Sequence, residues 1–186
     1  MTVIAGVALV LLDGDDDDEP ASSTTRRPGL PAFVVGERKQ ALVPAFEQAA
    51  RREGLPVALL EALAWRESEW NADIVNPQSG AVGIGQLLPE TARFVARELL
   101  DDPSLDPRDP EDNILMTAAY LRALIERFGG DTRSGLAAYL QGSTSVASAG
   151  ISPQTAQYLE QIEDLCKQFA AARADTTAST GDATDE

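Results

Sequence analysis

Residues 56–92 read PVALLEALAWRESEWNADIVNPQSGAVGIGQLLPETA, and this stretch decides the fold. Its first part, up to Trp70, places apolar side chains at helical spacing behind Pro56, a residue type favoured at the start of a helix. The part that follows breaks this period with asparagine, serine, proline and glycine. The stretch therefore predicts a helix that opens into one glycine-rich loop or small hairpin region.

The sequence on both sides of this stretch is also helical in pattern. Apolar residues recur at intervals of three and four, Gly54 and Gly129 end two of the segments, and Ser152 before Pro153 is typical of a helix start. Helices are expected over residues 37–54, 56–70, 90–100, 110–130, 132–142 and 152–174. The sequence thus predicts an all-α fold, a compact helical domain whose glycine-rich excursion follows its second helix.

Both ends of the chain differ from this domain. Residues 2–12 are apolar throughout but too short to cross a bilayer, which takes about 20 residues. We interpret residues 1–12 as the stub of a membrane anchor or signal, because the alternative, a buried strand, has nothing nearby to pair with. Residues 13–36 and 173–186 are acidic and poor in apolar side chains, so we expect a disordered linker and tail around a domain at residues 37–172.

The composition excludes several classes of chemistry. The 186 residues include 15 Lys+Arg and 30 Asp+Glu, a net charge of −15, whereas nucleic-acid binding relies on clustered basic residues. There is no histidine and one cysteine, which excludes histidine-based triads, histidine zinc sites and an internal disulfide. The acidic run Asp13–Glu19 lacks the spaced ligands of a calcium loop. We therefore expect no nucleic acid, no metal and no cofactor, and chemistry carried by carboxylates, hydroxyls or amides.

Glu67 lies on the apolar face of the helix expected at residues 56–70, three residues after Ala64 and four after Leu63. Burial disfavours the charged form of a carboxyl group and raises its pKa toward the range of a general acid. The alternative is a structural carboxylate paired with an arginine, and helical spacing does not separate the two. Glu69, two residues further on, is expected to face solvent.

The loop after this helix carries Gly80, Gly83 and Gly85 in front of Gln86. Glycine allows the backbone to approach a ligand closely, and the Gln86 amide offers both a donor and an acceptor. A glycine-rich loop alone also fits an ordinary turn. Directly after a carboxylate on an apolar face, it is typical of a sugar-binding cleft.

These residues resemble the signature of the soluble lytic transglycosylase family. The family's Glu-Ser pair, followed by an aromatic residue and Asn, is matched by WRESEWN, and its S-x-x-G-A-x-G-L-M-Q-x-M-P-x-T-A stretch by residues 79–92. Three later blocks match in the family's order, namely DPEDNILMTAAYL, GLAAYLQG and TAQYLEQI. The resemblance covers roughly residues 45–165 and implies a fold related to goose-type lysozyme, in the lysozyme-like α+β superfamily.

The resemblance implies cleavage of the β-1,4 bond between N-acetylmuramic acid and N-acetylglucosamine in peptidoglycan, with formation of a 1,6-anhydromuramoyl end. Glu67 would protonate the glycosidic oxygen and then, once ionised, deprotonate the muramoyl 6-hydroxyl. Tyr139 is the candidate for orienting Glu67 or the substrate's acetamido group, with an ordinary core aromatic as the alternative. Tyr120 and Tyr158 are assigned to the core. The positions expected to line the substrate cleft are Ser68, Gly83 and Gln86.

The resemblance also implies a location and a partner. Peptidoglycan glycan strands would be the partner of a monomeric protein at the cell envelope, secreted or attached to the membrane through residues 1–12. Because the chain is acidic, anionic wall polymers would repel it. Binding would then depend on the neutral sugar cleft.

The chain departs from the family pattern at several positions. Leu140 stands where the family has Asn after the tyrosine of the A-A-Y block, which removes one cleft contact and leaves Gln141 as its replacement. Gly85 replaces a methionine and Ala118 a glycine. Two rival hypotheses stay open: a lysozyme-type hydrolase that uses Asp73 to hold a water, and a non-catalytic glycan-binding domain, which Leu140 favours.

Overall fold

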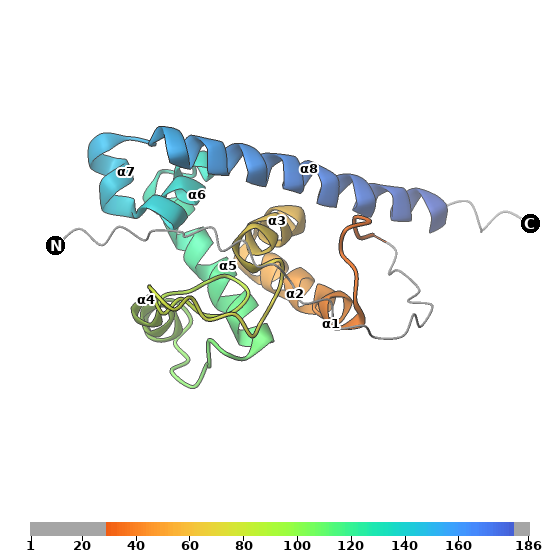
Figure 1. The fold of residues 1–186 in the computed structure, drawn as a ribbon, viewed down its shortest axis with the longest axis horizontal. Helices are drawn as coiled ribbons and strands as arrows, with labels where there is room; N and C mark the ends of the chain where they lie inside the picture. The colour runs from red at the N-terminus through yellow and green to blue at the C-terminus, as the bar shows by residue number, and fades with distance from the viewer. Residues whose placement is uncertain (1–28, 181–186) are drawn as a thin grey trace, which may run out of the picture.

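The computed structural model describes residues 29–180, with side chains up to Asp175. Isolated β-bridges join Val82 to Val75 and to Leu87. Residues 29–180 contain no β-strand beyond these bridges. The predicted all-α fold is confirmed (Figure 1). Its elements are α1 (Glu37–Ala41), α2 (Val43–Glu53), α3 (Val57–Ser68), α4 (Pro89–Phe94), the π-helical segment η1 (Val95–Leu99), α5 (Pro110–Arg127), α6 (Thr132–Gln141), α7 (Ser143–Ala149) and α8 (Pro153–Thr180).

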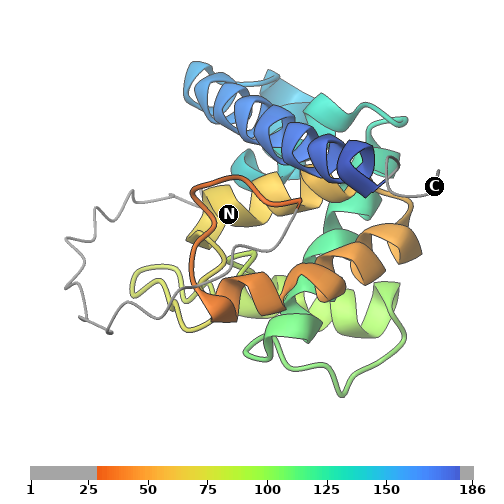
Figure 2. The ribbon, with the colours of Figure 1, turned by 90° about the vertical axis from the view of Figure 1, so that its right-hand side faces the viewer.

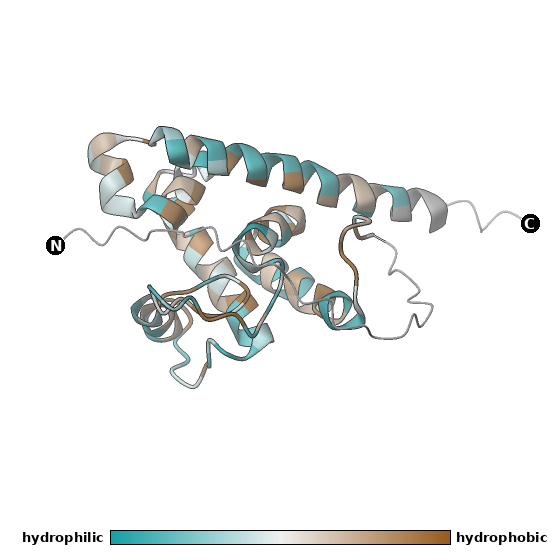
Figure 3. Cartoon of the chain, viewed as in Figure 1, coloured by the Kyte–Doolittle hydropathy of each residue, from teal (hydrophilic) through white to brown (hydrophobic). Residues whose placement is uncertain are grey.

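Helix α3 is the centre of the bundle. It packs against α8 on one side and against α2 and α5 on others, and Figures 1 and 2 both place the long α8 across it. Leu60, Leu63 and Ala64 of α3 are fully buried. Figure 3 shows hydrophilic and hydrophobic residues alternating along α8. Its apolar residues Leu159, Ile162 and Phe169 are fully buried, as an amphipathic surface helix requires. The last turn of α3 is therefore held in place from several sides.

An aromatic cluster fixes the chain directly after α3. Trp70 is 2% exposed, and its ring lies 4.5 Å from that of Phe46 and 5.4 Å from that of Phe169, centroid to centroid. Phe33 completes the cluster, 4.9 Å from Trp65. Aromatic pairs at these separations add to the energy of burial. Residues from α2, α8 and the segment before α1 thus meet at the end of α3.

Two details of the helix prediction need correction. The single helix expected at residues 37–54 is divided into α1 and α2, because Pro44 has no N–H to donate to the carbonyl of Gln40. Residues 143–149, which lie between two expected helices and were not expected to be helical, form α7. Its residues are small and mostly polar, without apolar side chains at helical spacing. Hydrophobic periodicity therefore does not predict this helix.

The domain also extends beyond both of its predicted boundaries. Leu30 and Val34, placed in the expected linker at residues 13–36, are buried in the core, because this short apolar group covers the aromatic cluster. At the other end, α8 continues through the expected tail to Thr180, and Arg173 forms ion pairs with the domain. The described residues include no helix with the length and hydropathy of a membrane span. Residues 1–28, with the predicted anchor stub and acidic run, lie outside the described residues.

Candidate active site

The end of α3 presents Glu67 in its last turn. The helix ends because Glu69 adopts a left-handed conformation (φ 53°), and Trp70 follows with φ 61°. Such angles are costly for residues other than glycine. The buried Trp70 maintains them, since its indole N–H donates to the carbonyl of Glu61 at 3.0 Å. Glu69 is exposed, as predicted, whereas Glu67 points toward α8 and meets Tyr158 there.

The carboxyl group of Glu67 has a pKa close to neutral pH. Burial raises its pKa to about 7, against the opposing effects of the Tyr158 hydroxyl and the Arg66 charge. Tyr158 donates a short hydrogen bond to Glu67 Oε1. A carboxyl group with this pKa is available both as acid and as base around neutral pH, which is the property a general acid–base catalyst needs.

Tyr139 reaches the same place from α6. Its hydroxyl donates to the carbonyl of Gly85 at 2.7 Å, and its ring lies 5.4 Å from that of Tyr120. Burial, and next the charge of Glu67, raise the pKa of the Tyr139 phenol well above its ordinary value. The hydrogen bond from Tyr139 joins α6 to the glycine-rich loop that follows α3.

The glycine-rich loop is fastened to α3 and α5. Ser68 Oγ donates to the carbonyl of Ile84 at 2.8 Å, and Asn113 Oδ1 accepts from the N–H of Gly85 at 2.8 Å. A β-carbon at Gly83 would lie 2.5 Å from Asn113 Nδ2, and one at Gly85 would lie 1.9 Å from Thr117 Oγ1. These glycines are therefore required for the approach of the loop to α5, a neighbour that the sequence did not reveal.

The other predicted cleft residues make internal contacts. Gln86, in a left-handed conformation (φ 49°), donates from Nε2 to the carbonyl of Gly83 at 3.0 Å. Ser68 is 7% exposed and its hydroxyl is used by the loop. Together with Gly83, these residues shape the glycine-rich loop after α3.

Gln141 is the last residue of α6 and contacts residues other than those of the glycine-rich loop. Its Nε2 donates to Ser145 Oγ and to the carbonyl of Gly150, both at 2.9 Å, and its Oε1 accepts from the N–H of Ser152 at 3.0 Å. The amide is thus used to join α6, α7 and the start of α8. The neighbouring Leu140 is half-buried against the main core.

Two further residues complete the comparison with the sequence. Asp73 is exposed in the loop, its N–H bonded to Asn71 Oδ1 at 3.0 Å, and it is not among the groups that shift the pKa of Glu67. Tyr158, which the sequence interpretation assigned to the core, is 4% exposed and bonds to Glu67 across 91 positions of sequence. Its presence in the family-like block TAQYLEQI was the signal that could have found it.

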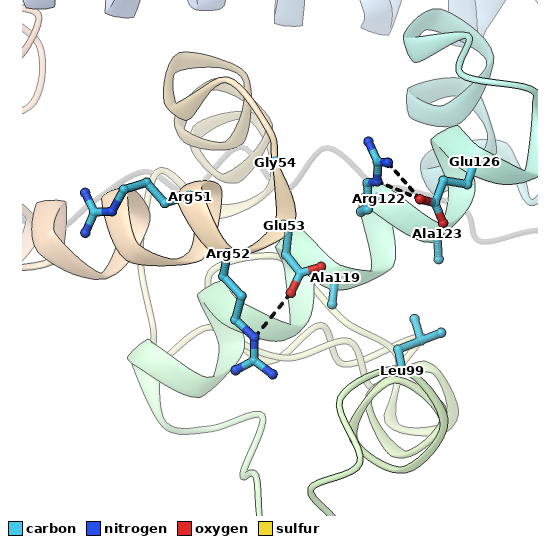
Figure 4. Close-up of a pocket in the computed structure, with 9 residues that line it drawn as sticks. All are labelled: Arg51, Arg52, Glu53, Gly54, Leu99, Ala119, Arg122, Ala123 and Glu126. Carbon is cyan, nitrogen blue, oxygen red and sulfur yellow. Dashed lines mark hydrogen bonds and ion pairs between the residues drawn. The ribbon is translucent and has the colours of Figure 1, made fainter.

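A separate pocket of about 620 Å³ lies between α2, η1 and α5 (Figure 4). Arg52 pairs with Glu53 at 3.5 Å and Arg122 with Glu126 at 2.8 Å inside it, while Arg51 points away from the others. Its lining residues are Arg51, Arg52, Glu53, Gly54, Leu99, Ala119, Arg122, Ala123 and Glu126. None of the residues around Glu67 takes part, so the two sites are distinct.

The fold and the site define a helical domain with a carboxyl group of pKa about 7 at the end of a helix that leads into a glycine-rich loop. Comparison with known proteins then gives the family. Residues 44–162 match the model of the transglycosylase SLT domain, and the chain belongs to that family. The resemblance found in the sequence is thereby confirmed.

Several relatives are considerably longer than this chain. It is 28% identical over 142 residues to the peptidoglycan transglycosylase gp16 of Escherichia phage T7, covering 70% of this chain and 11% of gp16. It is 30% identical over 100 residues to the soluble lytic murein transglycosylase of Escherichia coli strain K12, covering 52% of this chain and 15% of that protein.

Solved structures show the same fold. The lytic transglycosylase Slt from Pseudomonas aeruginosa superposes with a TM-score of 0.65 at 22% identity, covering 75% of this chain and 24% of that one. The 70 kDa soluble lytic transglycosylase from Escherichia coli gives a TM-score of 0.54 at 26% identity, with the same coverage.

Proposed function

We propose that this chain is a peptidoglycan lytic transglycosylase. It cleaves the β-1,4 bond between N-acetylmuramic acid and N-acetylglucosamine and leaves a 1,6-anhydromuramoyl end. The observation that carries the proposal is the Glu67 carboxyl group, with a pKa of about 7 and the Tyr158 hydroxyl donating to it. Membership of the family and the transglycosylase activity for which its relatives are named support it.

In the proposed reaction Glu67 acts twice. The protonated carboxyl group gives its proton to the glycosidic oxygen as the bond to the muramoyl carbon breaks, and the substrate's acetamido group stabilises the resulting cation. The ionised Glu67 then takes the proton of the 6-hydroxyl while that oxygen bonds to the muramoyl carbon, which closes the anhydro ring. The carboxyl group ends protonated, as it began. A pKa close to 7 serves both steps, because neither protonation state is strongly disfavoured.

The surrounding residues have supporting roles in this proposal. Tyr158 orients the carboxyl group of Glu67, and Tyr139 holds the carbonyl of Gly85 in the glycine-rich loop. Ser68, Gly83 and Gln86 keep the loop in the shape that forms the cleft wall. Gln141 supports the far end of α6 through its three internal hydrogen bonds rather than touching sugar.

The proposed substrate implies a place and mode of action. The protein acts on glycan strands outside the cytoplasm, as a monomer that is secreted or attached through residues 1–12. Its net charge of −15 gives no attraction to anionic wall polymers, so recognition depends on the neutral sugars.

The test is digestion of purified peptidoglycan by the full chain, with mass analysis of the released muropeptides. We expect products that are one water lighter than the hydrolytic products, because the anhydro ring replaces the free reducing end. Reducing ends instead would mean that a water attacks, as in the Asp73 hypothesis. No release by the wild-type chain, when a characterised transglycosylase digests the same preparation, would overturn the proposal in favour of a non-catalytic glycan-binding domain.

A further inference from the structure

Arg66 connects α3 to α8 directly beside Glu67. Its guanidinium carbon lies 5.1 Å from the centroid of the Tyr158 ring, within the range of a cation–π contact. Its Nε donates to Gln161 Oε1 at 2.7 Å. Tyr158 and Gln161 are three residues apart on α8 and so lie on the same face of that helix. One side chain of α3 therefore touches both the ring that serves Glu67 and a polar neighbour of that ring.

The contacts of Arg66 are unlike those of the arginines that form ion pairs. No described carboxylate lies within ion-pair distance of Arg66, whereas Arg133 and Arg173 both pair with glutamates. The planar guanidinium of Arg66 contacts the face of an aromatic ring and an amide oxygen instead. Arginine is suited to such a site because a guanidinium stacks and donates a directed hydrogen bond at once, which an ammonium does not.

We propose that Arg66 is a positioning residue, which lies over the Tyr158 ring, is anchored by Gln161, and so fixes the Tyr158 hydroxyl on Glu67. The inference rests on the proposed function and adds a residue to its machinery. A tyrosine ring turns about two side-chain bonds, and a group held over its face restricts that motion. The guanidinium thereby keeps the phenol in the orientation that its hydrogen bond to Glu67 requires.

Arg66 also acts on Glu67 through its charge. The Tyr158 hydroxyl from α8 and the charge of Arg66 from α3 both act on the carboxyl group, and Glu67 in turn acts on Tyr139 of α6. Of these three neighbours, Arg66 alone is a cation. It lowers the pKa of Glu67 against the larger effect of burial. Position and charge are separable, because well below pH 7 Glu67 is protonated whether or not Arg66 is present.

The experiment compares Arg66→Met, Arg66→Lys and Gln161→Leu with the wild type, using kcat and KM on a soluble glycan-strand oligomer across pH. For Arg66→Met we expect kcat well below pH 7 to fall about three- to tenfold with little change in KM, the range of one cation–π contact. The upper limb of the pH profile of kcat for this variant should move to higher pH by about half a unit, since a nearby positive charge is lost. Arg66→Lys should keep the limb and regain part of kcat. Gln161→Leu should lower kcat without moving the limb.

The matched control is Arg133→Gln, which removes an arginine that also bridges to α8, through Glu163 at 2.5 Å, away from the residues around Glu67. It should leave both kcat and the limb unchanged. A rise in KM alone for Arg66→Met would make Arg66 a substrate contact and overturn the proposal. Unchanged kcat and an unchanged limb would overturn it too.

A measurement without substrate separates this inference from the proposed function. NMR of the free protein reports the pKa of the Glu67 carboxyl group, through the chemical shift of its carboxyl carbon. It also reports the flipping rate of the Tyr158 ring. We expect Arg66→Met to raise the first and speed the second, with a melting temperature near wild type. If the wild type released no muropeptides but these NMR changes appeared, the function would fail and the positioning role would stand. If peptidoglycan were cleaved but neither quantity changed, the positioning role would fail alone.

Discussion

Helix α3 carries two glutamates, six positions apart, that the fold treats in opposite ways. Glu61 is fully buried and bonded twice by Arg173, at 2.5 and 3.0 Å, and Arg173 also reaches Glu47 at 3.1 Å. Glu67 is half-buried and receives a hydroxyl instead of a cation. Burial raises the pKa of both carboxyl groups, but at Glu61 the bonded guanidinium directly opposes that rise. Burial alone therefore does not make a catalytic acid.

The sequence interpretation had left these two environments open for Glu67. The structure assigns the arginine-paired one to Glu61, whose partner comes from the far end of α8. What distinguishes Glu67 is the lack of an ion pair among the described residues, so its proton can leave and return near pH 7.

The largest effect expected from this comparison is the loss of activity in Glu67→Gln. The amide has nearly the shape of the carboxyl group but has no proton to exchange, and removing a positioned general acid typically lowers the rate about 10²- to 10⁴-fold. Release of muropeptides from purified peptidoglycan measures it. Glu69→Gln, at the exposed end of the same helix, is the matched control and should retain wild-type activity. Clearing by Glu67→Gln at a wild-type rate would remove Glu67 from the mechanism.

The next effect concerns Glu61 and is one of stability. Removing one partner of a buried ion pair typically costs about 3–5 kcal/mol. Since Arg173 is 23% exposed and Glu61 can take up a proton, we expect Arg173→Met to lower the free energy of unfolding by about 2–4 kcal/mol. Denaturant unfolding measures it.

Lys167→Met is a suitable control for Arg173→Met, because its ion pair with Asp164 on the same helix is exposed and contributes little. The Arg173 variant should also recover stability as the pH falls, since Glu61 is then protonated. A free energy of unfolding within the error of the wild type would show that Glu61 does not depend on its arginine.

A third effect separates the two carboxyl groups by pH. The folded-state pKa of Glu67, about 7, lies above its ordinary value of 4.5, so the folded state binds more protons than the unfolded state between these values. Stability from this group is therefore fully present below pH 4.5 and is lost as pH rises toward 7, by up to about 3 kcal/mol. Glu67→Gln lacks this loss.

The measurement is the free energy of unfolding of wild type and Glu67→Gln as a function of pH. The difference between them should increase in favour of the variant across that interval and remain constant above it. Subtracting the two curves cancels the other titrating groups, which are common to both. A constant difference at every pH would mean that Glu67 has an ordinary pKa.

Comparison of the two glutamates also shows what the sequence could predict. The helix at α3 and the place of Glu67 on it followed from Leu63 and Ala64, because helical spacing is a local property. The partners did not follow. Tyr158 and Arg173 come from α8, and no local pattern tells which turn of that helix faces which turn of α3. The glycines of the loop were expected to let the backbone approach a ligand. In the structure they make room for Asn113 and Thr117 of α5.

The smallest expected effect concerns Leu140 of α6, and it tests whether this side chain belongs to the core, as Glu61 does, or to the substrate cleft. Leu140 stands where the family has Asn, yet it packs half-buried against the main core. For Leu140→Asn we expect a loss of about 1–2 kcal/mol, from reduced apolar burial and an amide placed against apolar neighbours, and turnover within about twofold of wild type.

Melting temperature and muropeptide release, measured on the same preparation, distinguish the two possibilities for Leu140. Leu165→Asn is the control, because Leu165 packs in the same half-buried way on α8 and should lose similar stability with no effect on turnover. A cleft position would behave differently: the new amide would gain one substrate hydrogen bond, and turnover would rise by up to about tenfold, a decade corresponding to about 1.4 kcal/mol. Such a rise with an unchanged melting temperature would place Leu140 in the cleft. A lower melting temperature without a gain assigns Leu140 to the core, where its half-buried packing places it.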